Sequence, residues 1–150
     1  MAEMQQRIEK ALTQYPWLVI EEGGRILGYT YATGHRDRMA YQWSADVSVY
    51  VHQQARRRGI ARRLYTALLR ILRQSGYFNA YAGIALPNQG SVSLHEAMGF
   101  TQVAVYEQVG YKHGVWRDVG WWHLSLGEHL TSPDVPRRFS ELREEIKIED

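Results

Sequence analysis

The sequence predicts an α+β domain built on a mixed, mostly antiparallel twisted sheet that is flanked by helices. Short segments alternate apolar and polar residues, as half-buried strands do, while other segments repeat apolar residues at helical spacing. The order of these segments is helix, hairpin, strand, helix, strand, helix, strand, strand, which requires at least one strand–helix–strand crossover. A length of 150 residues with 45% hydrophobic residues fits one globular domain.

The first third of the chain predicts a helix followed by a hairpin. Apolar residues at helical spacing predict an amphipathic helix that ends near Pro16. Trp17–Glu21 and Arg25–Thr33 are predicted strands joined by a turn at residues 22–24. Residues 34–42 form a polar, charged loop. The apolar residues of the first helix are Ile8, Ala11, Leu12 and Tyr15.

The middle of the chain predicts a strand, a helix and another strand. Residues 43–51 alternate strictly, with Trp43 and then Ala or Val at every second position, which predicts a strand. A helix begins near Gly59, and Gly76 follows it as a C-cap. Tyr77–Leu86 is the next predicted strand. The apolar stripe of the helix consists of Ile60, Leu64, Leu68, Ile71 and Leu72.

The last third predicts a short helix and a final strand pair. Ser91 is the expected N-cap of a helix that runs to Met98, after a loop at residues 87–90. Strands are expected at 101–109 and 116–126, around a loop from Gly110 to Gly114. The domain therefore spans residues 1–127. Residues 128–150 form an extension with a charged helix expected over residues 137–147.

The composition excludes several classes of protein. Eighteen Lys and Arg against sixteen Asp and Glu leave a net charge of +2, which is too balanced for a dedicated nucleic-acid binder. No apolar run approaches the ~20 residues of a membrane span, and the charged N-terminus is unlike a signal peptide. The chain has no cysteine. We therefore expect a cytoplasmic protein that binds neither nucleic acid nor membrane.

A cluster of arginines precedes the central helix. Arg56, Arg57 and Arg58 lead into Gly59, and Arg62 follows within the first helical turn. The free N–H groups at a helix start carry partial positive charge, and a glycine lets an anion approach the backbone. The pattern predicts a phosphate site, although a solvated first turn explains the same residues equally well. It matches neither a Walker A loop nor a dinucleotide-binding glycine motif.

Several motifs together resemble the GNAT superfamily of N-acetyltransferases. Arg56-x-x-Gly59-x-Ala61 resembles its coenzyme A signature, and residues 88–100 resemble its Asn-x-x-Ser-x-x-Leu-His-Glu segment followed by Gly-Phe. Residues 15–19 and 110–120 resemble in particular the phosphinothricin and methionine sulfone/sulfoximine acetyltransferases. The similarity runs from about residue 3 to about residue 126.

The resemblance implies that acetyl-CoA is the acetyl donor, transferred directly without a metal or an acyl-enzyme. By this similarity, strand residues offer backbone groups to the pantetheine arm, residues of the basic loop hold the pyrophosphate, and Asn88 lies near the thiol. The strand residues are Val49, Tyr50 and Val51. The loop residues are Arg57, Arg58, Gly59, Ile60, Ala61 and Arg62.

Two residues are catalytic candidates. An ammonium group must lose a proton before it attacks a thioester. In the resembled family a strand Glu is the usual base, and here Asp46, one methylene shorter, takes that position. The same family places a histidine where His113 lies, and imidazole titrates near neutrality. A polar strand residue and a surface histidine are the alternatives. His95, at the position of a thiolate-protonating Tyr in other GNAT enzymes, is expected instead to pack.

The acceptor is expected to be the primary amine of a small molecule, such as phosphinothricin or methionine sulfone/sulfoximine. Arg36 and Arg38 precede the central strand and can hold an acceptor carboxylate or phosphinate as forked donors, unless the loop is simply solvated. Ser48, two residues after Asp46 on the same strand face, is the third predicted acceptor residue.

Family members begin with a strand and a helix that precede the segment resembling residues 1–15, and the resemblance implies that this sequence lacks them. A misplaced start, a truncation and a real deletion each explain this, and the sequence does not choose among them. A real deletion would leave a sheet edge open for a second subunit to cover, and a homodimer is expected. Acetylation of protein N-termini or lysines, and a non-catalytic acyl-CoA-binding module, are the alternative functions.

Overall fold

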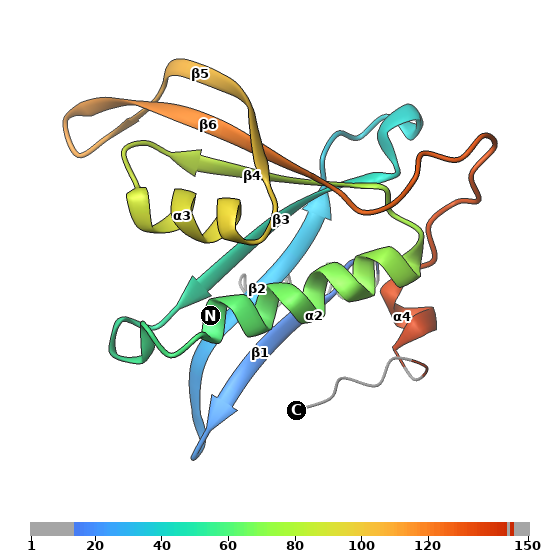
Figure 1. The fold of residues 1–150 in the computed structure, drawn as a ribbon, viewed down its shortest axis with the longest axis horizontal. Coiled ribbons are helices and arrows are strands. Elements are labelled where there is room, and N and C mark those ends of the chain that lie inside the picture. Colours follow the sequence, from blue (N-terminus) through green and yellow to red (C-terminus); the bar gives the residue numbers. More distant parts are fainter. Residues whose placement is uncertain (1–13, 144, 146–150) are drawn as a thin grey trace.

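The computed structural model describes residues 14–143 and 145, and shows one six-stranded sheet with helices packed against it (Figure 1). The strand order is β1-β2-β3-β4-β6-β5, and every neighbouring pair is antiparallel except β3 and β4. The predicted α+β class is confirmed. The strands are β1 (Trp17–Glu22), β2 (Arg25–Gly34), β3 (Ser44–Val51), β4 (Asn79–Ala85), β5 (Thr101–Lys112) and β6 (Val115–Ser125).

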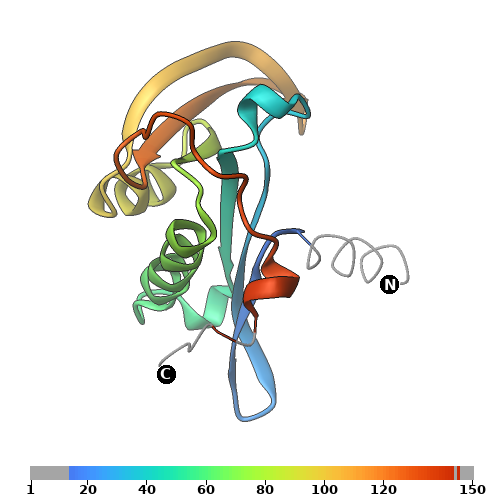
Figure 2. The same cartoon turned by 90° about the vertical axis from the view of Figure 1, so that its right-hand side faces the viewer.

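Helices α2 (Ile60–Ser75) and α3 (Gln89–Ala97) both cover the same face of the sheet (Figure 2). The predicted apolar stripe of α2 is buried, with Leu68 and Leu72 fully enclosed. Helix α2 also approaches β2 closely at Gly28, where a side chain would meet Ile60 and Leu64 and the Tyr50 carbonyl. A small residue at Gly28 therefore lets the crossover helix pack tightly on the sheet.

The parallel pair β3–β4 is joined only at its beginning. Ser44, Ala45 and Asp46 pair with Asn79, Ala80 and Tyr81. Beyond Asp46, β3 continues beside β2 while β4 continues beside β6. The two parallel strands therefore separate after their third pair, and in Figure 1 they diverge like the arms of a V.

Two predicted boundaries are wrong near the short helix and the last hairpin. Helix α3 begins at Gln89, and its N-cap is Asn88, whose side-chain oxygen accepts a hydrogen bond from the Ser91 backbone N–H at 3.1 Å. Ser91 itself is therefore inside the helix. The expected loop from Gly110 to Gly114 shrinks to His113 and Gly114, because β5 extends to Lys112.

The C-terminal extension packs back on the domain. Its only helix within the described residues is α4 (Phe139–Leu142), which lies inside the range of 137–147 predicted for a helix. Phe139 and Leu142 are buried, and the Arg137 backbone N–H donates to the Ser75 carbonyl at the end of α2. The expected first helix lies outside the described residues except for its last two positions, of which Gln14 is helical and Tyr15 is not.

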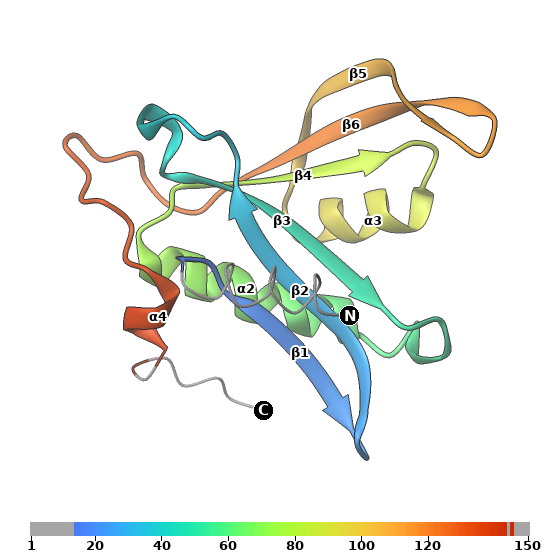
Figure 3. The same ribbon diagram turned by 180° about the vertical axis from the view of Figure 1, so that it is seen from behind.

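The sheet face opposite α2 and α3 carries the polar and aromatic side chains. Figure 3 shows this face, with β1, β2 and β3 in front of α2. Aromatic rings stack along it from Trp17 to Tyr31 at 4.4 Å and from Tyr29 to Tyr50 at 5.4 Å. Among the described residues no helix is long and apolar enough to cross a membrane.

Candidate active site

Strand β3 presents its polar residues on the open face, as its alternation predicts. Ala45 and Val47 are buried beneath α2, while Asp46, Ser48 and Tyr50 point the other way and Ser48 and Tyr50 are exposed. Thr33 of β2 lies opposite Asp46, and the register between β2 and β3 has no bulge. Asp46 therefore stands at the last joined pair of the parallel strands, where they begin to separate.

The separation leaves one edge of β3 without a strand partner. From Val47 to Val51, β2 is the only strand that pairs with β3 in the described part of the chain. Backbone N–H and C=O groups on such an edge accept an extended amide chain as an added strand. Val49 and Val51, predicted to contact pantetheine, lie on this edge.

The basic loop leads from the end of β3 into α2. Gly59 is the N-cap of α2, with a φ of 73°, and a side chain there would meet nothing within 4 Å. The Arg63 N–H is the first to bond back, to the Gly59 carbonyl at 3.1 Å. The preceding N–H groups, of Ile60, Ala61 and Arg62, are therefore those that a helix start leaves for a ligand.

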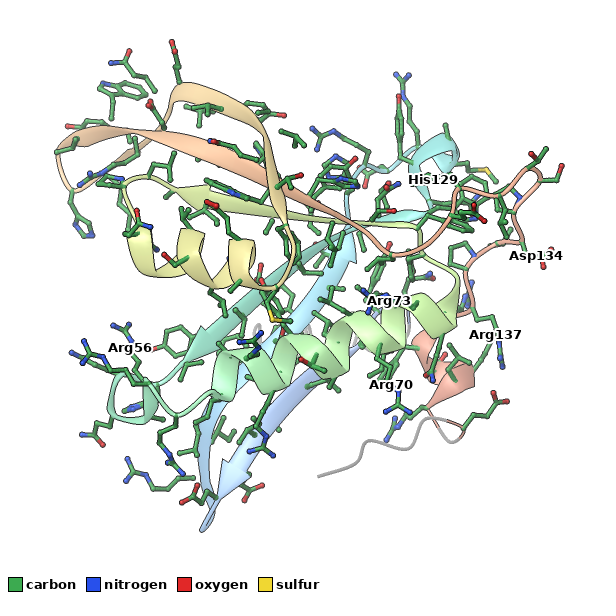
Figure 4. The ribbon with its side chains drawn as sticks, in the orientation of Figure 1. Arg56, Arg70, Arg73, His129, Asp134 and Arg137 are labelled. Carbon is green, nitrogen blue, oxygen red and sulfur yellow. The ribbon has the colours of Figure 1, made fainter. Side chains whose placement is uncertain are left out.

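The arginines of this loop have different surroundings. Arg56, labelled in Figure 4, extends away from the sheet at the loop. Arg58 is held by Glu22 of the β1–β2 hairpin, with 2.6 Å between its Nη2 and a carboxylate oxygen. Arg57 has a positive φ of 65°, an unusual backbone conformation for a residue with a side chain. Arg58 is therefore already neutralised by Glu22, whereas no ion pair involves Arg57 within the described residues.

The two residues of the short-helix motif have structural roles. Asn88 uses its oxygen to cap α3, which leaves its amide N–H₂ as the group available to a ligand. His95 is 3% exposed and lies between Tyr65 of α2 and the Ser91 carbonyl, as the packing interpretation predicts.

Asp46 is paired with a residue that the sequence alone did not single out. Its Oδ1 lies 2.6 Å from Nδ1 of His35, and both side chains are partly exposed. The His35 ring stacks on Tyr81 of β4 with centroids 4.4 Å apart. Burial raises the pKa of the Asp46 carboxyl, while its hydrogen bond to His35 and the charges of His35 and Arg36 oppose this rise.

A cleft of about 610 Å³ lies at the end of the sheet where β2 ends and β3 begins. Arg36 and Arg38 both line it, together with Thr33 and Gly34, which flank the His35–Asp46 pair. Arg138 of the C-terminal extension adds a third guanidinium. The two predicted acceptor arginines are thus brought together, whereas Ser48 lies farther along β3.

The structure does not bring His113 near Asp46 within one chain. His113 occupies the turn at the tip of the β5–β6 hairpin, with a φ of 53°. Across the sheet, Asp46 of β3 pairs with Tyr81 of β4, and Tyr81 pairs with His123 of β6. At ~3.3 Å per residue the tip lies roughly 30 Å from His123 along β6 and the turn. Its catalytic role stays a prediction.

His35 does not stand out in the sequence, because its partner Asp46 is eleven residues away in a different element. The signal that could have indicated His35 is that it is a titratable residue in the loop between two predicted strands, a few residues before the strand carboxylate of Asp46. Only the β2–β3 register, with Gly34 opposite Ala45, shows that His35 returns to Asp46.

The site combines a helix start suited to an anion, two parallel strands that separate, and a carboxylate where they separate. This combination is typical of an acyltransferase that uses a phosphorylated acyl donor. Comparison with known proteins gives the family. Residues 1–121 match the acetyltransferase (GNAT) domain, and the chain belongs to this family. The predicted class, an N-acetyltransferase dependent on acetyl-CoA, is confirmed at this level.

The relatives are similar over most of this chain. A phosphinothricin N-acetyltransferase of Streptomyces viridochromogenes is 40% identical over 87% of this chain and 70% of its own length. An L-methionine sulfoximine/L-methionine sulfone acetyltransferase of Salmonella typhimurium is 37% identical, over 84% and 73%. The solved structure of a phosphinothricin acetyltransferase from Sinorhizobium meliloti, in complex with acetyl-CoA, superposes with a TM-score of 0.83 at 33% identity, over 89% and 74%.

Proposed function

We propose that this chain transfers the acetyl group of acetyl-CoA to the primary amine of a small amino-acid analogue, of the kind represented by phosphinothricin and methionine sulfone or sulfoximine. The observation that carries the proposal is the position of Asp46. Asp46 stands where β3 and β4 separate, which suits the donor. It also pairs with Thr33, which lines the cleft together with Arg36 and Arg38, and this cleft suits an anionic acceptor.

The donor fits the open edge of β3 and the start of α2. The amides of a pantetheine arm can pair with the backbone at Val49 and Val51. The diphosphate then meets the free N–H groups of Ile60, Ala61 and Arg62, with Arg57 beside them. Tyr50 and Arg58 flank this path, and the Asn88 amide lies at the other arm of the V, beyond the end of β4.

The acceptor fits the cleft because its charges are complementary. Phosphinothricin and methionine sulfone carry a carboxylate, and phosphinothricin carries a phosphinate as well. A guanidinium holds such groups through two parallel hydrogen bonds. Arg36 and Arg38 supply this anchor at one end of the cleft, and the amine is then directed toward Thr33 and Asp46.

The reaction requires loss of a proton from the acceptor ammonium before the nitrogen attacks the thioester carbon. Acetyl transfer then forms a C–N bond and breaks the C–S bond, and coenzyme A leaves as a thiolate. The nitrogen gives up its second proton as the amide forms, and the coenzyme A thiolate takes it up. A carboxylate at Asp46 favours this sequence, because it draws the ammonium group into the site and can accept the departing proton, directly or through a neighbouring side chain or water.

The test is a turnover assay with acetyl-CoA and a panel of amines. Phosphinothricin, methionine sulfone and methionine sulfoximine should be acetylated, and Asp46→Asn should lower kcat/KM by about 10²-fold or more. Arg36→Gln and Arg38→Gln should raise KM for the acceptor without changing that for acetyl-CoA. Turnover of peptides but of none of these amines would replace the proposal by a protein acetyltransferase. Acetyl-CoA binding without any turnover would replace it by a binding module.

We also propose that the protein acts in the cytoplasm, where acetyl-CoA is available, and as a homodimer. The β5–β6 hairpin supports the second proposal, because it exposes a set of large apolar side chains of the kind that a partner surface covers. His113, at the tip of this hairpin, can take part in catalysis only if the hairpin reaches the site of a partner. The exposed residues are Val103, Val105, Tyr106, Val109, Tyr111, Val115 and Trp116.

Light scattering after size exclusion tests the homodimer. A mass near twice 17.4 kDa is expected, and Trp116→Glu should shift it toward the monomer. Mixing inactive Asp46→Asn with an inactive His113→Ala variant should restore part of the activity if the hairpin is shared between subunits. A fully active His113→Ala protein would remove this histidine from the mechanism.

A further inference from the structure

The contact between His35 and Asp46 has the geometry of a histidine–carboxylate dyad. The separation of 2.6 Å between Nδ1 and Oδ1 is that of a short, charge-assisted hydrogen bond. Asp46 is a carboxylate when it acts, and a carboxylate can only accept, so Nδ1 of His35 must carry the proton. Nε2 then presents a lone pair and can take a proton from another molecule.

His35 is held rigidly in this orientation. Its ring stacks on Tyr81 at an interplanar angle of 21°, and Trp121 meets it edge-on at 5.9 Å. The His35 backbone N–H also donates to the Ser44 carbonyl at 3.4 Å, which closes the loop onto β3. A ring fixed by two aromatic neighbours and one carboxylate is oriented in the way that proton transfer requires.

The sequence neighbours of His35 line the proposed acceptor cleft. His35 follows Thr33 and Gly34 and precedes Arg36, three residues that line the cleft, and its side chain is 19% exposed. The buried indole N–H of Trp121, next to His35, has no hydrogen-bond partner within the described residues.

We propose that His35, rather than Asp46, is the general base, and that Asp46 is a positioning residue that fixes the His35 ring. This inference rests on the proposed function. Nε2 of His35 removes one proton from the acceptor ammonium, which leaves a neutral amine and an imidazolium that Asp46 stabilises. The amine attacks the thioester, the C–N bond forms and the C–S bond breaks. The second nitrogen proton passes to the thiolate, and the imidazolium returns its proton to solvent.

The dyad accounts for the short carboxylate. Asp46 has its Oδ1 occupied by His35, and it is one methylene shorter than the residue at this position in the family that the sequence resembles. An imidazole inserted between the carboxylate and the amine restores the reach.

Several other charged or titratable groups lie around the pair. Arg36 and Asp37 come from the same loop, Tyr15 precedes β1, and Tyr81 and His123 lie on β4 and β6.

The experiment compares His35→Asn with Asp46→Asn in the full chain. Asparagine can keep the hydrogen bond to Asp46, because its amide nitrogen lies near the position of Nδ1, but it offers no base at the position of Nε2. We expect His35→Asn to lower kcat by about 10²-fold or more with KM for acetyl-CoA unchanged. The fall of kcat/KM at acidic pH should disappear in this variant, and added imidazole should partly restore His35→Ala.

The matched control is His129→Gln. This exposed histidine bonds to the Asn79 side chain at 2.9 Å, lies outside the proposed site, and should leave kcat and the pH profile unchanged. The ¹⁵N spectrum of the free enzyme should show His35 protonated at Nδ1. The dyad is overturned if His35→Asn keeps kcat within twofold and retains the wild-type pH profile while Asp46→Asn is inactive. A wild-type protein without turnover on any amine overturns the proposed function itself.

Discussion

The phenol oxygen of Tyr65 lies 2.7 Å from Nε2 of His95, in the buried contact between α2 and α3. Nδ1 of the same ring is 2.7 Å from the Ser91 carbonyl, so it must donate, and the Tyr65 hydroxyl must then donate to Nε2. Burial lowers the pKa of His95, which keeps the ring neutral. Both nitrogens are thus used to join the two helices that cover the sheet.

Removing the Tyr65 hydroxyl should destabilise the protein. Tyr65→Phe keeps the ring in the core but leaves Nε2 of His95 buried without a donor, which costs about 1–3 kcal/mol. Urea unfolding at neutral pH measures the loss. Tyr41→Phe is the control, because Tyr41 is 48% exposed and its hydroxyl can bond to water. An equal effect in the two variants would show that the Tyr65–His95 bond contributes nothing specific.

Replacing Asp46 should raise stability while it lowers activity. Burial raises the pKa of this carboxyl in the folded state, so ionisation of Asp46 opposes folding. The protonated carboxyl of Asp46 contributes its full share to the free energy of unfolding below the pKa of the unfolded chain, about 3.9. This share is lost as the pH rises through the higher pKa of the folded protein. Asp46→Asn remains neutral and should therefore unfold at higher urea than the wild type at pH 7.

The difference in unfolding free energy between Asp46→Asn and the wild type should shrink as pH falls toward 4. Urea curves between pH 4 and pH 8 measure it. Glu96→Gln, which removes an exposed carboxylate from α3, is the reference for a change of charge alone. A gain for Asp46→Asn that is constant over this range would contradict the assignment to ionisation.

Local patterns predicted the strands and the crossover helix because their signals lie in adjacent residues. The alternation of β3 correctly placed Val47 in the core and Asp46 on the open face. The His35–Asp46 pair depends on the strand register, which no local pattern contains. The cap of α3 was misplaced because Asn88 and Ser91 are both suitable N-caps. The tip of the last hairpin was misplaced because Gly110 suggested a loop, although it pairs with Arg117.

The two arginines before Gly59 should differ in their effect on coenzyme A binding. Arg58 is engaged by Glu22, and their side chains are 50% and 61% exposed. Arg57→Gln should weaken coenzyme A binding about tenfold, as expected for loss of one charged hydrogen bond. Arg58→Gln should have a smaller effect. Glu22→Gln should not weaken binding, and it should change the unfolding free energy by less than about 1 kcal/mol. Calorimetric titration separates these outcomes, and equal losses for both arginines would contradict them.

Gly59 should matter through its backbone conformation and not through space. A side chain there would meet no atom within 4 Å, but the φ of 73° is a left-handed conformation that costs other residues about 1–2 kcal/mol. Gly59→Ala should therefore lose about 1 kcal/mol of stability or shift the start of α2, and so weaken coenzyme A binding. Gly110 is the matched control, because its surroundings are equally open and its φ is not left-handed. Gly110→Ala should change stability by less than about 0.5 kcal/mol and leave binding unchanged. Urea unfolding measures the stability, and calorimetric titration measures coenzyme A binding. If Gly59→Ala matches Gly110→Ala in both stability and binding, the left-handed cap is not required for the anion site.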